Sequence, residues 1–260
     1  MAKSCPYCKI TTTKTSSAEQ ELYAYVLELM QGKCKVKHNC RTVIESMELD
    51  VYVPDKKLAL EYDGLYWHSD EMQADKTYHL RKTAQCQEKG VHLVHVFENE
   101  WLYNKDIVKS RIRDLLGVHD KTVYARKCEV REVVSKASKQ FQDDNHIQGS
   151  INAPVSLGLY YKDELVSLMT FGKCRFDKKH EWELLRFCNK LGYHIPGAAS
   201  KLLKHFEHVC KPKSLVSYAD RRWSQGKLYR ALGFKLDHVS PPNYWYWHDH
   251  TTLLESRVNF

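Results

Sequence analysis

Apolar and polar residues alternate along two short segments of the chain, residues 49–53 and 58–63. An alternation of period two is typical of β-strands, in which successive side chains point to opposite faces of a sheet. Pro54 and Asp55 lie between the segments and favour a turn. The pattern therefore predicts a β-hairpin with one apolar face, made of Leu49, Val51, Val53, Leu58, Leu60 and Tyr62.

Before the hairpin, the apolar residues recur with a different period. Apolar residues recur at helical spacing over residues 22–29, which predicts a helix with an inward-facing stripe. Ser16 is placed to cap this helix and Glu19 to complete a capping box. Gly32 is expected to end it, and we expect residues 33–41 to form a basic loop.

The rest of the first half predicts two helices and a strand between them. Gly90 and Gly117 mark the helix ends, because glycine readily adopts the left-handed conformation that closes a helix. A continuous apolar run is typical of a buried strand. We expect a helix over residues 76–89, a strand over 91–97 and a helix over 104–116. Together with the hairpin, these elements predict a compact α/β unit.

The second half contains more strands than helices. A boundary is expected near residues 118–122. We expect strands at residues 123–126, 155–161, 165–171, 181–189, 214–219, 235–239 and 244–247, and helices at 135–144, 197–210 and 227–232. This order predicts a second, α+β domain.

Composition limits the class of protein. The chain has 260 residues, 43% of them hydrophobic, enough for one large or two ordinary domains. It has no apolar run of membrane-spanning length and no apolar signal core, so we expect neither membrane insertion nor secretion. Nine scattered cysteines, an odd count, argue against a disulfide framework. A reducing, cytoplasmic location fits these features.

The net charge of +8 is unevenly distributed. Residues 1–120 carry 17 Lys and Arg against 18 Asp and Glu, whereas residues 121–260 carry 23 against 14. The imbalance indicates that the second half meets a polyanion while the first half carries the chemistry.

Candidate chemistry gathers where the hairpin ends. Asp50 lies on the first strand, Glu61 and Asp63 share one face of the second, and His68 follows shortly after Gly64. Each carboxylate alone is more often a solvated surface group. Together, like charges side by side are destabilising unless something neutralises them. A hard divalent cation would do so, and such a site suits metal-assisted hydrolysis of a phosphodiester.

The run Leu-Glu-Tyr-Asp-Gly-Leu-Tyr-Trp-His, residues 60–68, resembles the site strand of very-short-patch-repair endonucleases. It is also similar to phage homing endonucleases with an E-D-x-H-D pattern, and both groups are related to the PD-(D/E)xK nucleases. The resemblance covers roughly residues 16–117. It implies a restriction-endonuclease-like α/β fold that cleaves DNA with Mg²⁺ or Mn²⁺.

The resemblance also implies roles for individual residues. Asp50 matches the metal-binding aspartate, and Tyr62 matches the position whose backbone carbonyl contacts the metal. His68, preceded by the matching aromatic Trp67, corresponds to a histidine that acts as acid or base near the scissile phosphate. Glu19 matches a glutamate on the first helix, although it could equally serve only as a cap.

Two positions depart from the family pattern. Asp63 stands where a lysine or a histidine is expected, so it would orient His68 or bind a second ion. His79 stands where the family has its last aspartate; it would ligate a metal, contact a phosphate or be a surface residue. Glu61 is expected to be a metal ligand with Asp50, the Tyr62 carbonyl and His68.

Cys5 and Cys8 form a CxxC pair, which is half of a zinc site. Cys34, His38 and Cys40 could complete it or be ordinary loop residues. The segment 1–15 is therefore a possible zinc-binding element.

The second half resembles the N-acetyltransferase fold, from its element order and from the run Leu-Tyr-Arg-Ala-Leu-Gly-Phe, residues 228–234. Its candidate phosphate-binding loop has a single glycine, Gly197, where that fold uses several. We therefore expect a domain adapted to hold DNA. Its candidate contacts are Lys173, Arg175, Lys178, Lys179, Arg186, Arg221, Arg222 and Trp223, although any one could be a solvated surface residue.

The sequence thus predicts an α/β protein with a nuclease domain over residues 16–119 and an acetyltransferase-like domain over 120–260. The expected activity is Mg²⁺-dependent, homing-like endonuclease cleavage of double-stranded DNA, by nicking or by a homodimer. Two alternatives stay open: an acyl-CoA-dependent transferase, and a DNA-binding protein without catalysis.

Overall fold

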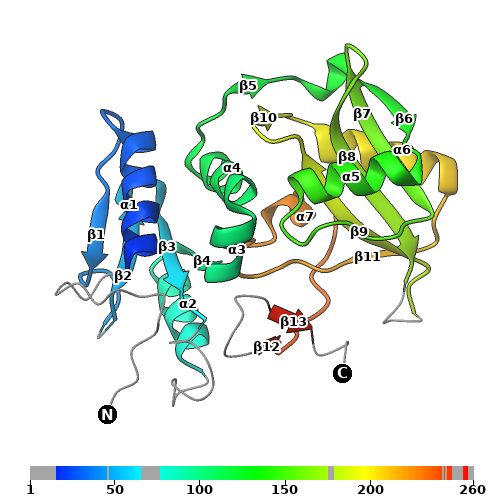
Figure 1. Ribbon diagram of the computed structural model, residues 1–260. Coiled ribbons are helices and arrows are strands. Elements are labelled where there is room, and N and C mark those ends of the chain that lie inside the picture. The colour runs from blue at the N-terminus through cyan, green and yellow to red at the C-terminus, as the bar shows by residue number, and fades with distance from the viewer. Residues whose placement is uncertain are drawn as a thin grey trace. The chain divides into compact units, whose positions relative to one another are not determined.

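The computed structural model describes residues 16–45, 47–65, 77–174, 179–241, 243, 245–247 and 254–256 (Figure 1). These residues divide into two compact units. One holds the described residues up to Lys105 and from Val239 onward, and the other spans Asp106–His238. The fold is mixed α/β, which confirms the predicted class. Among the described residues, no helix has both the length and the apolar character needed to cross a membrane.

The first unit is built on a four-stranded sheet with the order β1-β2-β3-β4. The strands β1, β2 and β3 are antiparallel neighbours, whereas β3 and β4 are parallel. The bounds are α1 (Ser17–Met30), β1 (Lys37–Cys40), β2 (Leu49–Val53), η1 (Pro54–Lys56), β3 (Leu58–Asp63), α2 (Tyr78–Glu88), β4 (His92–Phe97), α3 (Glu98–Tyr103), β12 (Trp245–Trp247) and β13 (Leu254–Ser256).

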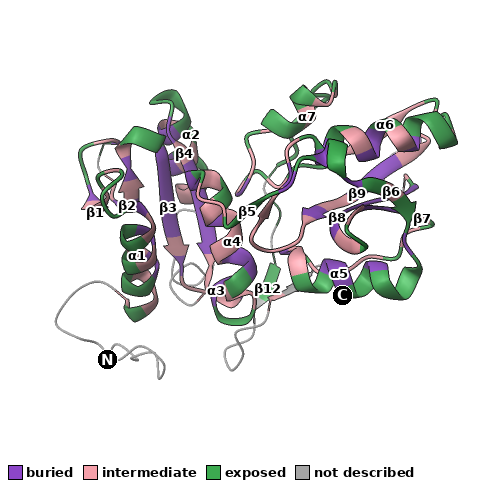
Figure 2. Ribbon diagram, turned by 90° about the horizontal axis from the view of Figure 1, so that it is seen from above, coloured by how far each residue is buried: buried purple, intermediate pink, exposed green. Residues whose placement is uncertain are grey.

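The local signals explain these elements. Ser16 caps α1 by accepting a hydrogen bond from the Glu19 amide at 3.1 Å, and Gly90 adopts a positive φ just after α2. Helix α1 packs against β2 and β3, and α2 packs against β4. The two helices cover opposite faces of the sheet (Figures 1 and 2), so β3 is buried along nearly its whole length.

The second unit contains a five-stranded sheet with the order β11-β9-β8-β7-β6. Its main core lies between this sheet and α6, where the rings of Phe171 and Phe206 stack 3.7 Å apart. The bounds are α4 (Lys105–Leu116), β5 (Lys121–Thr122), η2 (Ala125–Lys127), β6 (Glu129–Glu132), α5 (Ser135–Asn145), β7 (Val155–Tyr161), β8 (Glu164–Lys173), β9 (Trp182–Asn189), β10 (Tyr193–His194), α6 (Ala198–Cys210), β11 (Leu215–Ser217) and α7 (Lys227–Ala231).

Several predicted elements differ from the structure. The expected loop at residues 33–41 contains β1, a polar edge strand without the apolar alternation that would reveal it. Of the expected strand at 123–126, the last two residues belong instead to the 3₁₀ turn η2, in which the amides of Lys127 and Cys128 bond the carbonyls of Tyr124 and Ala125. Residues 235–239 form no strand; Leu236 is 80% exposed and has no apolar face to join.

Candidate functional site

The pairing of β2 with β3 sets the first pair of carboxylates side by side. Val51 lies opposite Leu60, so Asp50 and Glu61 are the next facing pair on the other side of the sheet. The backbone amide of Tyr62 donates to Asp50 Oδ2 at 2.8 Å. The structure thus brings together three of the residues expected to form the metal site.

The two acids of β3 do not face solvent. Glu61 is 6% exposed and Asp63 is 3% exposed, which argues against the alternative that they are surface groups. A buried carboxylate is unfavourable unless a nearby cation or hydrogen bonds compensate its negative charge.

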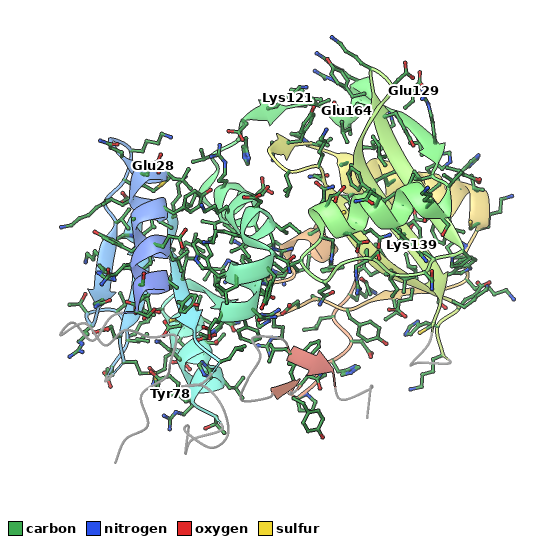
Figure 3. All side chains as sticks on the ribbon, viewed as in Figure 1. Glu28, Tyr78, Lys121, Glu129, Lys139 and Glu164 are labelled. Atoms are coloured by element: carbon green, nitrogen blue, oxygen red, sulfur yellow. The ribbon has the colours of Figure 1, made fainter. Side chains whose placement is uncertain are left out.

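A lysine from another element compensates Glu61. Lys82 lies one turn into α2, which begins at Tyr78 (labelled in Figure 3), and is 1% exposed. Its ammonium group forms a buried ion pair with Glu61 Oε1. A lysine thus lies beside β3, but it comes from a helix and not from position 63.

One ammonium does not balance the cluster. Burial raises the pKa of Asp50 to about 6, against the hydrogen bond from Tyr62 and the charge of Lys82. Burial and the Asp50 carboxylate raise the pKa of Glu61 well above its ordinary value. Burial, with Asp50 again adding to it, raises the pKa of Glu19 to about 7. The cluster therefore resists full ionisation of its carboxyl groups when no cation is bound.

The raised pKa values make the stability of the metal-free protein sensitive to pH. Asp50 and Glu19 keep protons in the folded state that the unfolded chain releases at lower pH, so their ionisation removes stability as pH rises from about 4 to about 7. For Asp50 alone the loss is about 3 kcal/mol, at roughly 1.4 kcal/mol per pKa unit.

Asp50→Asn should remove the Asp50 part of this loss while keeping an oxygen that accepts from Tyr62. In chelator, the variant should gain about 3 kcal/mol of unfolding free energy relative to wild type between about pH 4 and about pH 7. Urea denaturation at each pH measures this difference. A difference that stays constant across the range would contradict the raised pKa of Asp50.

Glu19 joins the same unit from the start of α1. Its carboxylate oxygen Oε1 lies 3.2 Å from His38 Nε2 on β1, and the His38 ring stacks on Tyr23 with centroids 4.4 Å apart. The Glu19 side chain thus contacts β1, and only its backbone amide takes part in the cap at Ser16. His38 was predicted only as a possible zinc ligand in a loop.

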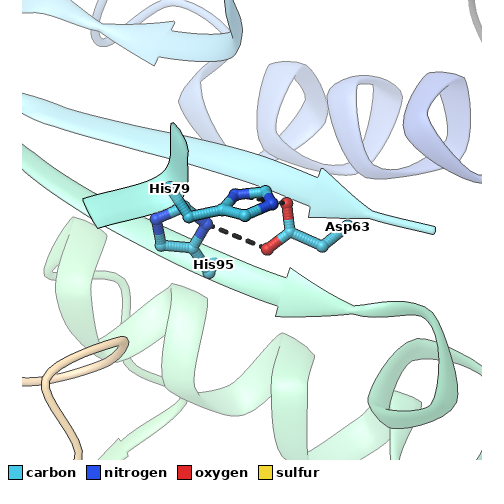
Figure 4. Close-up of side chains that lie close together, drawn as sticks. All are labelled: Asp63, His79 and His95. Atoms are coloured by element: carbon cyan, nitrogen blue, oxygen red, sulfur yellow. Dashed lines mark hydrogen bonds and ion pairs between the residues drawn. The ribbon is translucent and has the colours of Figure 1, made fainter. Parts of the chain in front are cut away.

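A second cluster surrounds Asp63. His95 Nδ1 lies 2.9 Å from Asp63 Oδ2, and His79 Nδ1 lies 3.7 Å from Asp63 Oδ1. Figure 4 shows the two imidazoles, from β4 and α2, both directed at the carboxylate of Asp63. His79, for which the sequence left a site role and a surface position open, therefore lies beside Asp63. The sequence did not single out His95, because a histidine within an apolar run is typical of an ordinary position in a buried strand.

Other predicted residues lie outside the described part of the chain. They are Cys5, Cys8, Trp67, His68, Arg175 and Lys178. Their expected roles stay predictions.

The DNA-contact candidates of the second unit differ in exposure. Arg221 is exposed, whereas Arg222 pairs with Asp220 at 2.9 Å. Trp223 is 3% exposed, and the guanidinium of Arg111 lies 4.6 Å from its ring centroid. The indole thus packs within the unit, and base stacking by Trp223 stays a prediction that would require the surrounding loop to move.

The loop with the single glycine forms an open pocket at the start of α6. The pocket has a volume of about 430 Å³ and is lined by residues that include Gly197, Arg126 and Lys204. The ammonium of Lys201 donates to the carbonyls of Ala125 and Cys128. One of the basic side chains here therefore serves to hold the backbone.

Comparison of the chain with family models finds no match, and neither does a search of curated proteins. The function is therefore inferred from the geometry of the site.

Proposed function

We propose that the chain is a Mg²⁺-dependent endonuclease that hydrolyses phosphodiester bonds of double-stranded DNA, of the phage homing type. The observation that carries the proposal is the pair of half-buried Asp50 and buried Glu61, with buried Lys82 beside Glu61. Two carboxylates and an ammonium group in one buried place are expensive to maintain, and this arrangement is suited to binding a cation and a phosphate together.

The donor set fits a hard divalent cation. Mg²⁺ is bound through carboxylate and carbonyl oxygens and usually retains several waters. Asp50 and Glu61 supply carboxylates, and Tyr62 would supply its carbonyl. Glu61 Oε2 is buried and has no hydrogen-bond partner among the described atoms, so it is an available acceptor that a cation would satisfy.

The bound ion would polarise a phosphoryl oxygen and lower the pKa of a water. The protein's own groups would do the remaining work. Lys82 would supply positive charge beside the developing charge of the phosphate. His68 would exchange a proton with the water or the leaving oxygen, since an imidazole titrates near neutral pH.

The second unit would hold the DNA. The positive charge excess of residues 121–260 supports contact with phosphates, which contribute affinity that falls with salt. Among the described candidates, Lys173, Lys179 and Arg221 are exposed and could make such contacts. The proposal also includes double-stranded DNA as the partner, formation of a homodimer, and location in the cytoplasm of an infected bacterium.

A plasmid-nicking assay tests it. Supercoiled plasmid with the full chain and Mg²⁺ should become nicked or linear, and excess chelator should stop the conversion. A Glu61→Gln preparation purified in parallel controls for contaminating nucleases. If the chain binds DNA but neither Mg²⁺ nor Mn²⁺ supports cleavage, the chain is a DNA-binding protein without this activity.

The acyltransferase alternative depends on the pocket at the start of α6. The backbone amides at a helix N-terminus and the side chains of Arg126 and Lys204 suit a pyrophosphate. Clear affinity for acetyl-CoA in calorimetry, without nicking, would favour this alternative over the nuclease.

A further inference from the structure

We propose that Asp63, His79 and His95 form a binding site for a transition-metal ion of the Zn²⁺ class. This site is separate in its ligands from the Asp50–Glu61 pair, and its existence does not depend on the nuclease proposal. The three residues come from β3, α2 and β4, and each offers a ligand atom within 4.8 Å of the other two.

The distances suit tetrahedral coordination. Zinc binds nitrogen and carboxylate oxygen at about 2.0–2.2 Å, so neighbouring ligand atoms lie about 3.3 Å apart. The separations from Asp63 oxygens are 2.9 Å to His95 Nδ1 and 3.7 Å to His79 Nδ1, on either side of this value. The two rings are nearly perpendicular, at 82°, and both face the carboxylate (Figure 4).

A hydroxyl group is placed to support the ligand form of His95. Thr83 Oγ1 lies 2.9 Å from His95 Nε2. When this hydroxyl accepts from Nε2–H, the lone pair of Nδ1 is left for a metal. Relative to the tautomer in which Nδ1–H donates to Asp63, this form requires the ring proton to move from Nδ1 to Nε2 and the hydroxyl hydrogen to rotate away. Such a partner on the second ring nitrogen is usual for metal-bound histidine.

The type of ligand atom distinguishes the Asp63 cluster from the Asp50–Glu61 pair. Two imidazoles and one carboxylate favour borderline ions such as Zn²⁺, Co²⁺ and Ni²⁺, whereas Asp50 and Glu61 offer oxygen alone. Three protein ligands leave a fourth position for water or an anion, as in catalytic rather than structural zinc sites.

Another group of the same residue types makes a useful contrast. Asp114, His119 and His194 in the second unit also have ligand atoms within 4.8 Å of one another. The rings of His119 and His194, however, stack at 4.0 Å and 14°. Lone pairs in two parallel planes do not converge on one ion, so this group should not bind without side-chain rearrangement.

Cobalt titration of the chelator-treated full-length protein tests the proposal. Co²⁺ bound by nitrogen and oxygen should produce visible d–d absorption without thiolate charge-transfer bands. His79→Ala should weaken this binding by at least about 100-fold, since it removes one of three ligands. Asp50→Asn and His119→Ala should retain it, and millimolar Mg²⁺ should not displace the ion.

The choice of variant guards against misfolding. His95 is 5% exposed, and its replacement risks the fold, whereas the side chain of His79 is 33% exposed. Unchanged Co²⁺ affinity and spectrum in His79→Ala would overturn the proposal, and so would a wild-type protein that binds no Co²⁺. Asp63 and His95 would then be a hydrogen-bonded pair. Retained plasmid nicking in that case would leave the nuclease proposal standing.

Discussion

Asp50→Asn is expected to lower Mg²⁺-dependent DNA cleavage by about 10³-fold or more. The substitution keeps the size of the side chain and an acceptor for the Tyr62 amide, but it removes the charge that would bind the ion. Metal ions contribute several kcal/mol to charge stabilisation in such reactions, and about 4 kcal/mol corresponds to about 10³ in rate. Initial rates of plasmid nicking measure the loss.

The matched control is Asp55→Asn, in the turn of the same hairpin, where the side chain is exposed. It should cleave at the wild-type rate. DNA binding by both variants should match wild type within a few fold in chelator. Cleavage by Asp50→Asn at the wild-type rate would exclude Asp50 as a metal ligand and with it the proposed site.

Lys82→Met should destabilise the metal-free protein by about 3–5 kcal/mol at pH 8. Removing one partner of a buried ion pair leaves the other charge uncompensated, and here Glu61 would stay beside Asp50 and Asp63, whose charges already act on it. The loss should shrink at low pH, where Glu61 is protonated. Urea denaturation in chelator at both pH values measures it.

Two further variants make the result specific. Lys89→Met changes an exposed lysine just after the same helix and should change stability by no more than about 0.5 kcal/mol. Adding Glu61→Gln to Lys82→Met should recover much of the loss, because it removes the uncompensated charge. If Lys82→Met costs less than about 1 kcal/mol at pH 8, Lys82 does not neutralise the acidic cluster.

The hairpin is the part of the site that the sequence predicted well. Alternation with a period of two placed Asp50, Glu61 and Asp63 on one face, and the structure has the same two strands. The alternation did not show that this face is buried. Burial depends on α2, which packs on the sheet from residues far along the chain.

Lys82 shows why the compensating charge was missed. Within α2 its sequence neighbours are polar, and a lysine at this place in a helix is ordinarily exposed. The apolar Leu80 of the same helix is 44% exposed, whereas Lys82 is 1% exposed. Hydrophobicity thus predicts the wrong inward face for this helix, because electrostatic pairing with Glu61 sets the orientation of Lys82.

By itself, the sequence determined the α/β class, most helices and strands, and the acidic face of the hairpin. These features depend on caps, glycines and periodicity, which act over a few residues. Only the tertiary structure decided which groups meet the acids. The parallel register of β3 and β4 places His95 beside Glu61, and the packing of α2 adds Lys82 and His79. Such contacts span tens of residues, and no local pattern specifies them.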